Sequence, residues 1–514
     1  MNGADILCDT LLANGLDVCF ANPGTSEMHF VAALDAKPRM RCVLGLFEGV
    51  VTGAADGYAR MADKPAATLL HLGPGLANGL ANIHNAKRAH TPMVNIVGEH
   101  ATHHIPYDAP LTTDIEGLAA PMSHWVRRVG SSADVSRCAA DAITEARTPP
   151  GRIATLILPA DTAWNEAPAT LAYANVRKPA PVAEERVRAA AEALRAGGAT
   201  MLLSGRALRG SALETASRIA QTAGVRIMAQ QSNGRVQRGA GRVAIDRVPY
   251  AVDRALSAFA QTRAVILVGA KSPVAFFAYP GMPSSLLPTD CEVIEMGGPG
   301  DDLDVALQQL ADRLHVPRDL APRVAARSGP VMPNGKLTAA AIAQVIVSLS
   351  PENAILCDES VSSGRDFFPI SHGAAPHDFL QITGGAIGIG LPLAAGAAIA
   401  CPDRKVVAMQ ADGSGMYTLQ ALWTQARERL DIVTVVFANR SYAILHNELK
   451  TLGAKAPGHN ARRMLDLVDP ALDWVQMAKG LGVDAARSDD ATSFADLFRA
   501  AVSARGPFLI EAVI

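Results

Sequence analysis

Asp412 and Asn439 are the side chains whose types and spacing first indicate chemistry. Each stands at the end of a strand-like apolar run, Val406–Gln410 for the aspartate and Ile432–Phe437 for the asparagine. The segment between them, Tyr417–Leu430, has apolar residues at helical spacing and predicts one crossover helix. A strand–helix–strand unit of this kind is parallel, and ligands bind beyond the carboxyl ends of such strands. We therefore expect both side chains at one ligand-binding edge.

These residue types suit a hard divalent cation together with a phosphate group. A carboxylate, an amide oxygen and loop carbonyls are the oxygen ligands that such a cation prefers. Gly413 and Gly415 leave backbone N–H groups free at a helix start, where phosphate is held. Two plainer interpretations stay open, since Asp412 could cap a helix and Asn439 could be a turn residue. The pattern predicts a metal–diphosphate anchor.

Composition limits the function classes. At 514 residues the chain is too long for one hydrophobic core, and about three domains are expected. Apolar residues make up 49% and charged residues 19%, as in soluble globular proteins. A formal net charge of -2 gives no reason to expect nucleic acid or an anionic membrane as a partner. The cysteines are scattered and no signal peptide is evident, so we expect reduced thiols in a cytoplasmic protein.

Alternating strand-like and helical runs predict an α/β protein of three domains, each a mostly parallel sheet flanked by helices. The expected domains span residues 1–166, 182–316 and 333–514, separated by segments rich in proline and alanine. The first and third domains have the same strand–loop–helix–strand layout, which indicates one unit used twice. The uncharged run Gly384–Ala400 is too short for a membrane span and is expected to be a buried helix with a glycine-rich entry.

The spacing of Asp412 and Asn439 resembles the signature of the thiamine-diphosphate-dependent decarboxylases and carboligases, which include benzoylformate decarboxylase and the acetolactate synthase large subunit. The usual signature opens Gly-Asp-Gly and closes Asn-Asn, whereas this chain has Ala411 and Ala438 at the first position of each. Further segments resemble the family in the same order along the chain: Asn22–Glu27, Phe47–Gly49, Ala54–Arg60, Leu72–Gly75, Pro92–Gly98 and Ile387–Pro392.

The resemblance implies thiamine diphosphate and Mg²⁺ as cofactors. Thiamine catalysis needs a carboxyl group that hydrogen-bonds the aminopyrimidine ring, and Glu48 matches it; a solvated surface glutamate is the alternative. The family also implies a cofactor-bending role for Ile387, which by composition alone is a core residue. Carried over from the family motifs, the cofactor-binding residues are Glu48, Ser362, Ile387, Gly413, Ser414 and Tyr442, and the Mg²⁺ ligands are Asp412, Asn439 and the carbonyl of Ser441.

The resemblance also implies catalytic residues on the substrate side. His71 matches a histidine that handles protons in benzoylformate decarboxylase, and Thr25 matches its substrate-contacting serine; a structural histidine and a loop or cap residue are the alternatives. A second active-site histidine of that enzyme has no counterpart in Pro273–Tyr279. Secondary candidates for the substrate pocket are His103, His104, Phe277, Leu445 and Glu448.

We therefore expect non-oxidative decarboxylation of a small 2-keto acid, with carboligation possible. An acetolactate synthase-like carboligase is the alternative, although the middle domain shows no obvious flavin-binding loop and is expected to lack FAD. Alternatives from other classes are an NAD-dependent dehydrogenase, using Gly384–Gly390 and Asp403, and a non-catalytic paralogue. The resemblance further implies a homodimer or homotetramer whose active sites form between subunits. The sequence leaves open which 2-keto acid is used.

Overall fold

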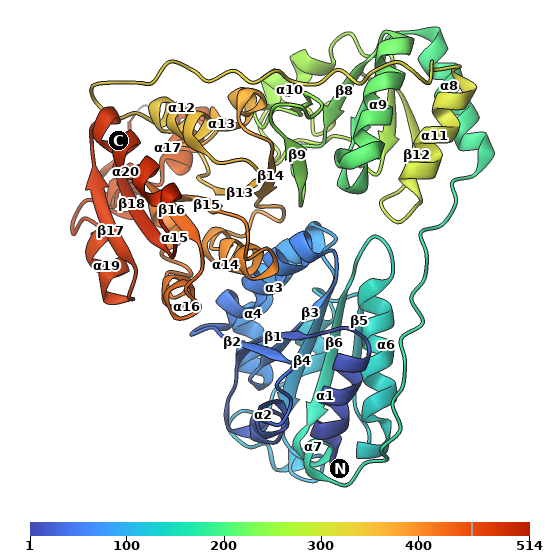
Figure 1. The fold of residues 1–514 in the computed structure, drawn as a ribbon, viewed down its shortest axis with the longest axis vertical. Helices are drawn as coiled ribbons and strands as arrows, with labels where there is room; N and C mark the ends of the chain where they lie inside the picture. Colours follow the sequence, from blue (N-terminus) through green and yellow to red (C-terminus); the bar gives the residue numbers. More distant parts are fainter. Residues whose placement is uncertain (454–455) are drawn as a thin grey trace.

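The computed structural model describes residues 1–453 and 456–514 and contains three sheets flanked by helices, which confirms the predicted α/β fold (Figure 1). The first sheet is parallel, with strand order β2-β1-β3-β4-β6-β5. Its strands are β1 Val18–Asn22, β2 Arg41–Leu44, β3 Ala66–Leu70, β4 Met93–Glu99, β5 Trp125–Arg128 and β6 Ile153–Pro159. Its helices are α1 Gly3–Ala13, α2 Met28–Asp35, α3 Glu48–Ala62, α4 Leu72–Arg88, α5 Ile115–Ala119, α6 Val135–Arg147 and α7 Ala160–Trp164, with the 3₁₀ turn η1 at Thr25–Glu27.

The second sheet is smaller and also parallel, in the order β10-β8-β7-β11-β12. Its strands are β7 Ala199–Leu203, β8 Arg226–Ala229, β10 Asp246–Arg247, β11 Ala264–Val268 and β12 Glu292–Gly297. The helices around it are α8 Glu184–Ala196, α9 Gly210–Ala223, α10 Val252–Phe259 and α11 Leu303–Arg313. Leucine, isoleucine, valine and alanine fill its core, as expected for parallel strands covered on both faces.

The third sheet has the order β17-β18-β16-β15-β13-β14-β9 and is parallel except at β9. Strand β9, Val236–Arg238, comes from the segment that otherwise builds the second sheet and pairs antiparallel with β14. The other strands are β13 Ala354–Glu359, β14 His377–Gln381, β15 Val406–Ala411, β16 Ile432–Ala438, β17 Asp484–Ser488 and β18 Phe508–Val513. The helices are α12 Ala339–Leu349, α13 Phe367–Ile370, α14 Gly390–Ala400, α15 Asp412–Gly415, α16 Ala421–Arg427, α17 Ala443–Thr451, α18 His459–Leu465, α19 Trp474–Gly480 and α20 Ala491–Ser503.

The first and third sheets share one topology. Numbered along the chain, the six strands β13 to β18 have the same spatial order as β1 to β6, with β9 added beyond β14. In this correspondence β3 and the start of α4 match β15 and the start of α15, while α3 matches α14. The unit predicted to occur twice is therefore present as two copies of a six-stranded sheet.

Helices α3 and α14 cross at very short range and join the two copies (Figure 1). A side chain at Gly57 would overlap the carbonyl of Leu393, and one at Gly396 would overlap the backbone of Ala54. Glycine at these positions lets the two backbones approach, which places both helices in one shared core. The run 384–400 is thus a buried helix with a glycine-rich entry, as predicted. Among the described residues, no helix has both the length and the apolar character needed to cross a membrane.

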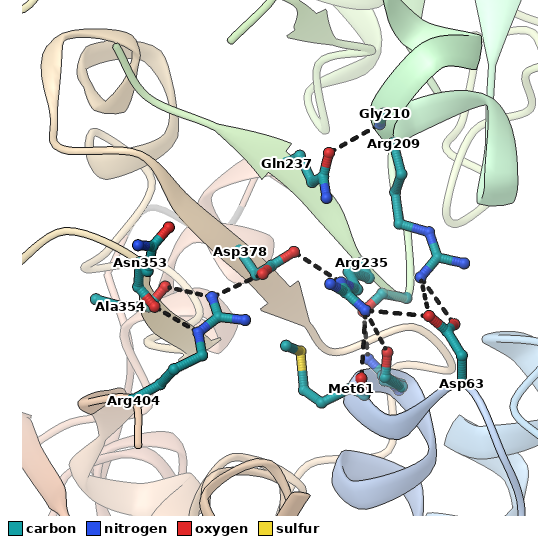
Figure 2. Close-up of polar contacts among 12 residues, drawn as sticks. Met61, Asp63, Arg209, Gly210, Arg235, Gln237, Asn353, Ala354, Asp378 and Arg404 are labelled. Carbon is teal, nitrogen blue, oxygen red and sulfur yellow. Dashed lines mark hydrogen bonds and ion pairs between the residues drawn. The ribbon is translucent and has the colours of Figure 1, made fainter. Parts of the chain in front are cut away.

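A chain of alternating charges joins all three sheets at their common junction (Figure 2). Arg209 of the second unit pairs with Asp63 at the end of α3 at 2.8 Å, and Arg235 lies 3.5 Å from the same carboxylate. Arg235 also pairs with Asp378 on β14 at 2.7 Å, and Arg404 binds that aspartate at 2.7 Å. Burial would raise the pKa of Asp378, but the two arginines outweigh burial and hold it below its usual value. The charge chain fixes β9 and β14 against the end of α3.

Candidate active site

The residues of the predicted metal–diphosphate anchor lie at the carboxyl ends of two adjacent parallel strands. Asp412 follows β15 directly and is almost fully buried. Its two carboxylate oxygens accept from the backbone N–H groups of Gly413 at 2.8 Å and Arg440 at 2.6 Å. Burial raises the pKa of Asp412 to about 6, partly opposed by these two donors. A divalent cation bound there would favour the ionised form.

Asn439 follows β16 and lies in the same cradle. Its side-chain oxygen accepts from the backbone N–H of Ser441 at 3.0 Å, and its side-chain nitrogen donates to Ser363 at 3.2 Å. The ring of Tyr442 packs against this cradle, since a side-chain carbon at Gly413 would lie 2.5 Å from the Tyr442 ring. Glycine at that position therefore lets the Tyr442 ring approach the backbone of the cradle.

The groups gathered here fit a hard cation. The groups available as metal ligands are one carboxylate, one side-chain amide and loop carbonyls. All of them offer oxygen ligands of the type that Mg²⁺ binds. Within residues 1–453 and 456–514, no group of three or more His, Cys, Asp or Glu side chains could hold a metal ion. A cation at this edge would therefore rely on Asp412 for its protein charge, with Asn439 and the Ser441 carbonyl as neutral ligands.

A fully buried glutamate, Glu359 at the end of β13, supports the loop that carries Ile387. Its two oxygens accept from the backbone N–H groups of Gly388 and Gly390, each at 2.5 Å. Gln410 also donates to it at 3.2 Å and donates to the hydroxyl of Ser414 at 2.6 Å. Burial raises the pKa of Glu359 to about 7, although these donors act in the opposite direction. The Ile387 loop and the cradle that contains Ser414 are thus linked through one side-chain network.

Helix α4 of the first sheet holds the other side of the same loop. The side chain of Asn85 accepts from the N–H groups of Gly384 at 3.0 Å and Ala386 at 3.3 Å, and donates to the carbonyl of Ala386 at 2.7 Å. Asn82 donates to the carbonyls of Gly49 at 2.8 Å and Gly388 at 3.2 Å. Both asparagines are buried, so their bonds to the loop have little competition from water.

Glu48 begins helix α3 and is buried rather than solvated, which excludes the alternative of a surface glutamate. One carboxylate oxygen accepts from the side chain of Asn78 on α4 at 3.0 Å. The other would touch a side-chain carbon at Gly75, at 3.0 Å. Glu48 is therefore held rigidly by the first turns of α4.

His71 and Glu27 form a pair beside Glu48. The Nδ1 atom of His71 lies 2.8 Å from a carboxylate oxygen of Glu27, which also accepts from the backbone N–H of Gly24 at 2.7 Å. The second oxygen of Glu27 accepts from Ser26 at 2.5 Å. Among the described residues, Nε2 of His71 has no hydrogen-bond partner and is the ring atom left to exchange a proton with a ligand. The pair has the base-and-orienter arrangement of proton-transfer sites.

The sequence-predicted residues form two groups within one chain. Glu48, His71 and Thr25 gather at the carboxyl edge of the first sheet. The second group is centred on Asp412 and Asn439 at the matching edge of the third sheet, and a cleft of about 1920 Å³ opens beside it. Predicted residues that line this cleft are Ser362, Ile387, Tyr442, Phe277, Leu445 and Glu448.

Two other predicted residues, His103 and His104, do not line the cleft and are exposed in the loop after β4. Their rings contact aromatic neighbours, with His103 6.5 Å from Trp164 and His104 5.9 Å from Tyr107 between ring centroids. The assignment of these two histidines to a substrate pocket stays a prediction.

Several side chains of the site were not singled out by sequence reasoning. Glu27 lies in the segment Asn22–Glu27, where the resemblance gives it no role, and Glu359 has no local motif. Asn78, Asn82 and Asn85 do carry a signal, because spacing of four and three residues places them on one face of a helix. Asn82 and Asn85 are buried and Asn78 is exposed; buried polar side chains on a helix indicate a site that supplies hydrogen-bond partners, since such groups must be satisfied.

Two family models match this chain. The description "Thiamine pyrophosphate enzyme, N-terminal TPP binding domain" matches residues 1–118, and "Thiamine pyrophosphate enzyme, C-terminal TPP binding domain" matches residues 367–512. Thiamine pyrophosphate and thiamine diphosphate are the same compound.

The relatives match along the whole chain. The "Putative acetolactate synthase large subunit IlvX" of Mycobacterium tuberculosis is 51% identical, covering 100% of this chain and 99% of the relative. Benzoylformate decarboxylase of Pseudomonas aeruginosa is 29% identical, covering 98% and 97% respectively. The solved structure of a thiamine diphosphate-dependent 4-hydroxybenzoylformate decarboxylase of Rhodococcus jostii has the same fold, with a TM-score of 0.85 at 24% identity over 100% of this chain and 99% of that one.

Proposed function

The chain belongs to the thiamine pyrophosphate enzyme family, and within that family we propose that it catalyses Mg²⁺-dependent, non-oxidative decarboxylation of a 2-keto acid. The observation that carries the proposal is the pair of His71 and Glu27 beside the buried Glu48. A decarboxylase must return a proton to the carbon that lost CO₂, and a histidine oriented by a carboxylate suits that step.

Each half of the site has a role in this proposal. Asp412, Asn439 and the Ser441 carbonyl would hold Mg²⁺, while the Gly413 and Ser414 backbone would receive the diphosphate. Glu48 would hydrogen-bond the aminopyrimidine ring, and Ile387 would support the bent cofactor. Bound thiamine diphosphate would supply a nucleophilic carbon for the keto group and accept the electron pair left by CO₂.

We further propose that a second copy of the chain completes each site. Glu48 and His71 do not line the cleft beside Asp412, and no hydrogen bond joins the two groups among the described residues. A mixing experiment tests this arrangement. Glu48→Gln and Asp412→Ala are each expected to be inactive alone, and activity should reappear when both are unfolded and refolded together. Continued inactivity of the refolded mixture would contradict shared sites.

The decarboxylase proposal is tested by reconstitution with thiamine diphosphate and Mg²⁺. Purified protein is supplied with pyruvate, 2-ketobutyrate and benzoylformate, and CO₂ and the organic products are measured. We expect CO₂ and aldehyde with wild-type protein and almost none with Glu48→Gln. Equal turnover by wild-type and Glu48→Gln would contradict the assignment of Glu48.

Carboligation is the second candidate, favoured by the 51% identity to a relative whose printed name refers to acetolactate synthase. The same product measurement separates the two outcomes, because a carboligase yields an acyloin or an acetohydroxy acid in place of free aldehyde. Adding a second 2-keto acid should raise the yield of such products only if carboligation is the main reaction.

A further inference from the structure

The cleft beside the Asp412 group extends well beyond the predicted cofactor-binding residues. Small-molecule sites occupy roughly 300 to 1,000 Å³, whereas this cleft measures about 1920 Å³ and reaches the second sheet. Its far wall includes Arg247, the last residue of β10, and Arg365, in the segment after Ser362. The room and the charge on this wall exceed what a small keto acid such as pyruvate needs.

Arg247 and Arg365 are held in place by aromatic rings rather than by carboxylates. The guanidinium carbon of Arg247 lies 4.5 Å from the ring centroid of Phe368, and that of Arg365 lies 4.8 Å from the ring of Tyr250. The only side-chain acceptor of Arg247 in the described residues is Gln381, at 2.9 Å, and neither arginine makes an ion pair there. Aromatic contact orients a guanidinium group without neutralising it.

Three acidic side chains of the cleft contact neighbouring side chains other than Arg247 and Arg365. Asp246 contacts His372 at 3.2 Å, Asp358 accepts from Ser360, and Glu448 accepts from Tyr279 at 3.3 Å. Two more acidic side chains of the cleft, Asp253 and Asp366, are exposed to solvent. Because neither Arg247 nor Arg365 has an ion pair within the described residues, both guanidinium groups remain available to an anionic ligand.

Arg247 is also partly buried, so leaving its positive charge without an anionic partner is energetically unfavourable. Burial lowers the pKa of Arg247, Asp358 opposes that shift, and the neighbouring Arg365 adds to it. A half-buried cation next to a second cation gains most from an anion that accepts hydrogen bonds from both.

We propose that Arg247 and Arg365 bind a distal carboxylate of the substrate, so that the enzyme acts on a 2-keto dicarboxylic acid. This inference rests on the proposed decarboxylase function. The carboxylate that leaves as CO₂ is a poor partner for two arginines, because ion pairs to it would be lost in the transition state. A carboxylate at the far end of the substrate keeps its ion pairs throughout the reaction and anchors the keto group near Ile387.

Binding of a substrate mimic tests the site without turnover. Glutarate has a carboxylate at each end and no keto group, and pentanoate has the same chain length with a single carboxylate. Calorimetric titrations use protein loaded with thiamine diphosphate and Mg²⁺. We expect glutarate to bind and pentanoate to bind at least about tenfold more weakly, since a charge-assisted pair is lost. Equal affinity for the two acids would overturn the proposal.

Substitutions locate the binding to the two arginines. Because Arg365 is exposed, the Arg365→Gln variant should fold normally. The fold of the Arg247→Gln variant is checked by circular dichroism before the titration. Each is expected to weaken glutarate binding about 10- to 100-fold. Arg188→Gln, an exposed arginine on α8 outside the cleft, is the matched control and should leave the affinity unchanged. Wild-type affinity in Arg365→Gln would contradict the inference.

Kinetics and a competing ligand separate the remaining outcomes. The KM for 2-ketoglutarate should rise in both variants, while the KM for 2-ketopentanoate should not. If ADP displaces glutarate and binds far more tightly, the site serves a nucleotide phosphate and the dicarboxylate proposal is wrong. Arginine-dependent glutarate binding without decarboxylation would overturn the proposed function alone, and decarboxylation without glutarate binding would overturn the anion site alone.

Discussion

Asn85 on α4 is expected to control cofactor affinity without touching the cofactor. Its side chain makes three hydrogen bonds to the backbone of Gly384 and Ala386, in the loop that leads to Ile387. Asn85→Ala removes all three and leaves the loop groups without their buried partner. At about 0.5 to 1.5 kcal/mol for each bond, the loop loses roughly 2 to 4 kcal/mol of stabilisation.

That loss converts into a change of affinity. Apparent affinity falls with the fraction of molecules in the binding-competent conformation. A destabilisation of about 3 kcal/mol can lower that fraction by up to about 100-fold, so the Kd for thiamine diphosphate should rise by as much. The value is an upper bound, because any surplus stability of the loop is lost first.

Calorimetric titration of thiamine diphosphate at saturating Mg²⁺ measures the effect. Asn85→Asp keeps the acceptor for the two N–H groups but loses the donor to the Ala386 carbonyl, so its Kd should lie between those of wild-type and Asn85→Ala. Asn175→Ala, an exposed asparagine, serves as the control. A wild-type Kd in a correctly folded Asn85→Ala protein would refute the reasoning.

Three further outcomes follow from the other buried contacts of the site. Glu27→Gln should lower kcat about 10- to 100-fold by loosening His71, with cofactor affinity unchanged in the same titration. Asp412→Asn should raise the Mg²⁺ concentration needed for half-maximal activity at least about tenfold, which a metal titration measures, because the charged ligand is lost. The pKa of Glu359 rises from 4.5 unfolded to about 7 folded, so its protonated form stabilises the fold below pH 4.5 and this contribution is lost as pH rises through 7. At ~1.4 kcal/mol per pKa unit, the free energy of unfolding should fall by an amount on the order of 3 kcal/mol. Between pH 4.5 and 7, the urea midpoint of the wild-type protein should therefore fall relative to that of Glu359→Gln. Midpoints that change in parallel over this pH range would contradict the prediction.

Local patterns predicted most of what places Asp412 and Asn439. Strands expected at Val406–Gln410 and Ile432–Phe437 appear as β15 and β16 with ends shifted by one residue. The crossover helix is shorter than expected, because the chain first forms the single turn α15 and then further turns before α16 begins at Ala421. Apolar spacing reports the buried face of a segment, whereas the turn that forms the cradle depends on glycines and backbone hydrogen bonds.

Contacts between distant segments could not be predicted in this way. Strand β9 has three residues and pairs with β14, more than a hundred residues later in the chain, so no local period marks it. Glu359 gains its partners from a distant loop and strand of its own unit, and Arg247 gains a partner from the third sheet; their types alone do not distinguish a buried site from an exposed surface. Such positions become visible only when burial and partners are known.

The asparagine face of α4 explains how one helix can position both groups of site residues. Asn78 binds Glu48, Asn82 binds the carbonyls of Gly49 and Gly388, and Asn85 binds the loop before Ile387. These side chains point from one face of one helix, so their relative positions are fixed by helical geometry. The α3–α14 crossing allows this arrangement, because only close backbone approach brings Gly49 and Gly388 within reach of the same amide group. The small residues of that crossing are therefore part of the construction of the site, as well as of the core.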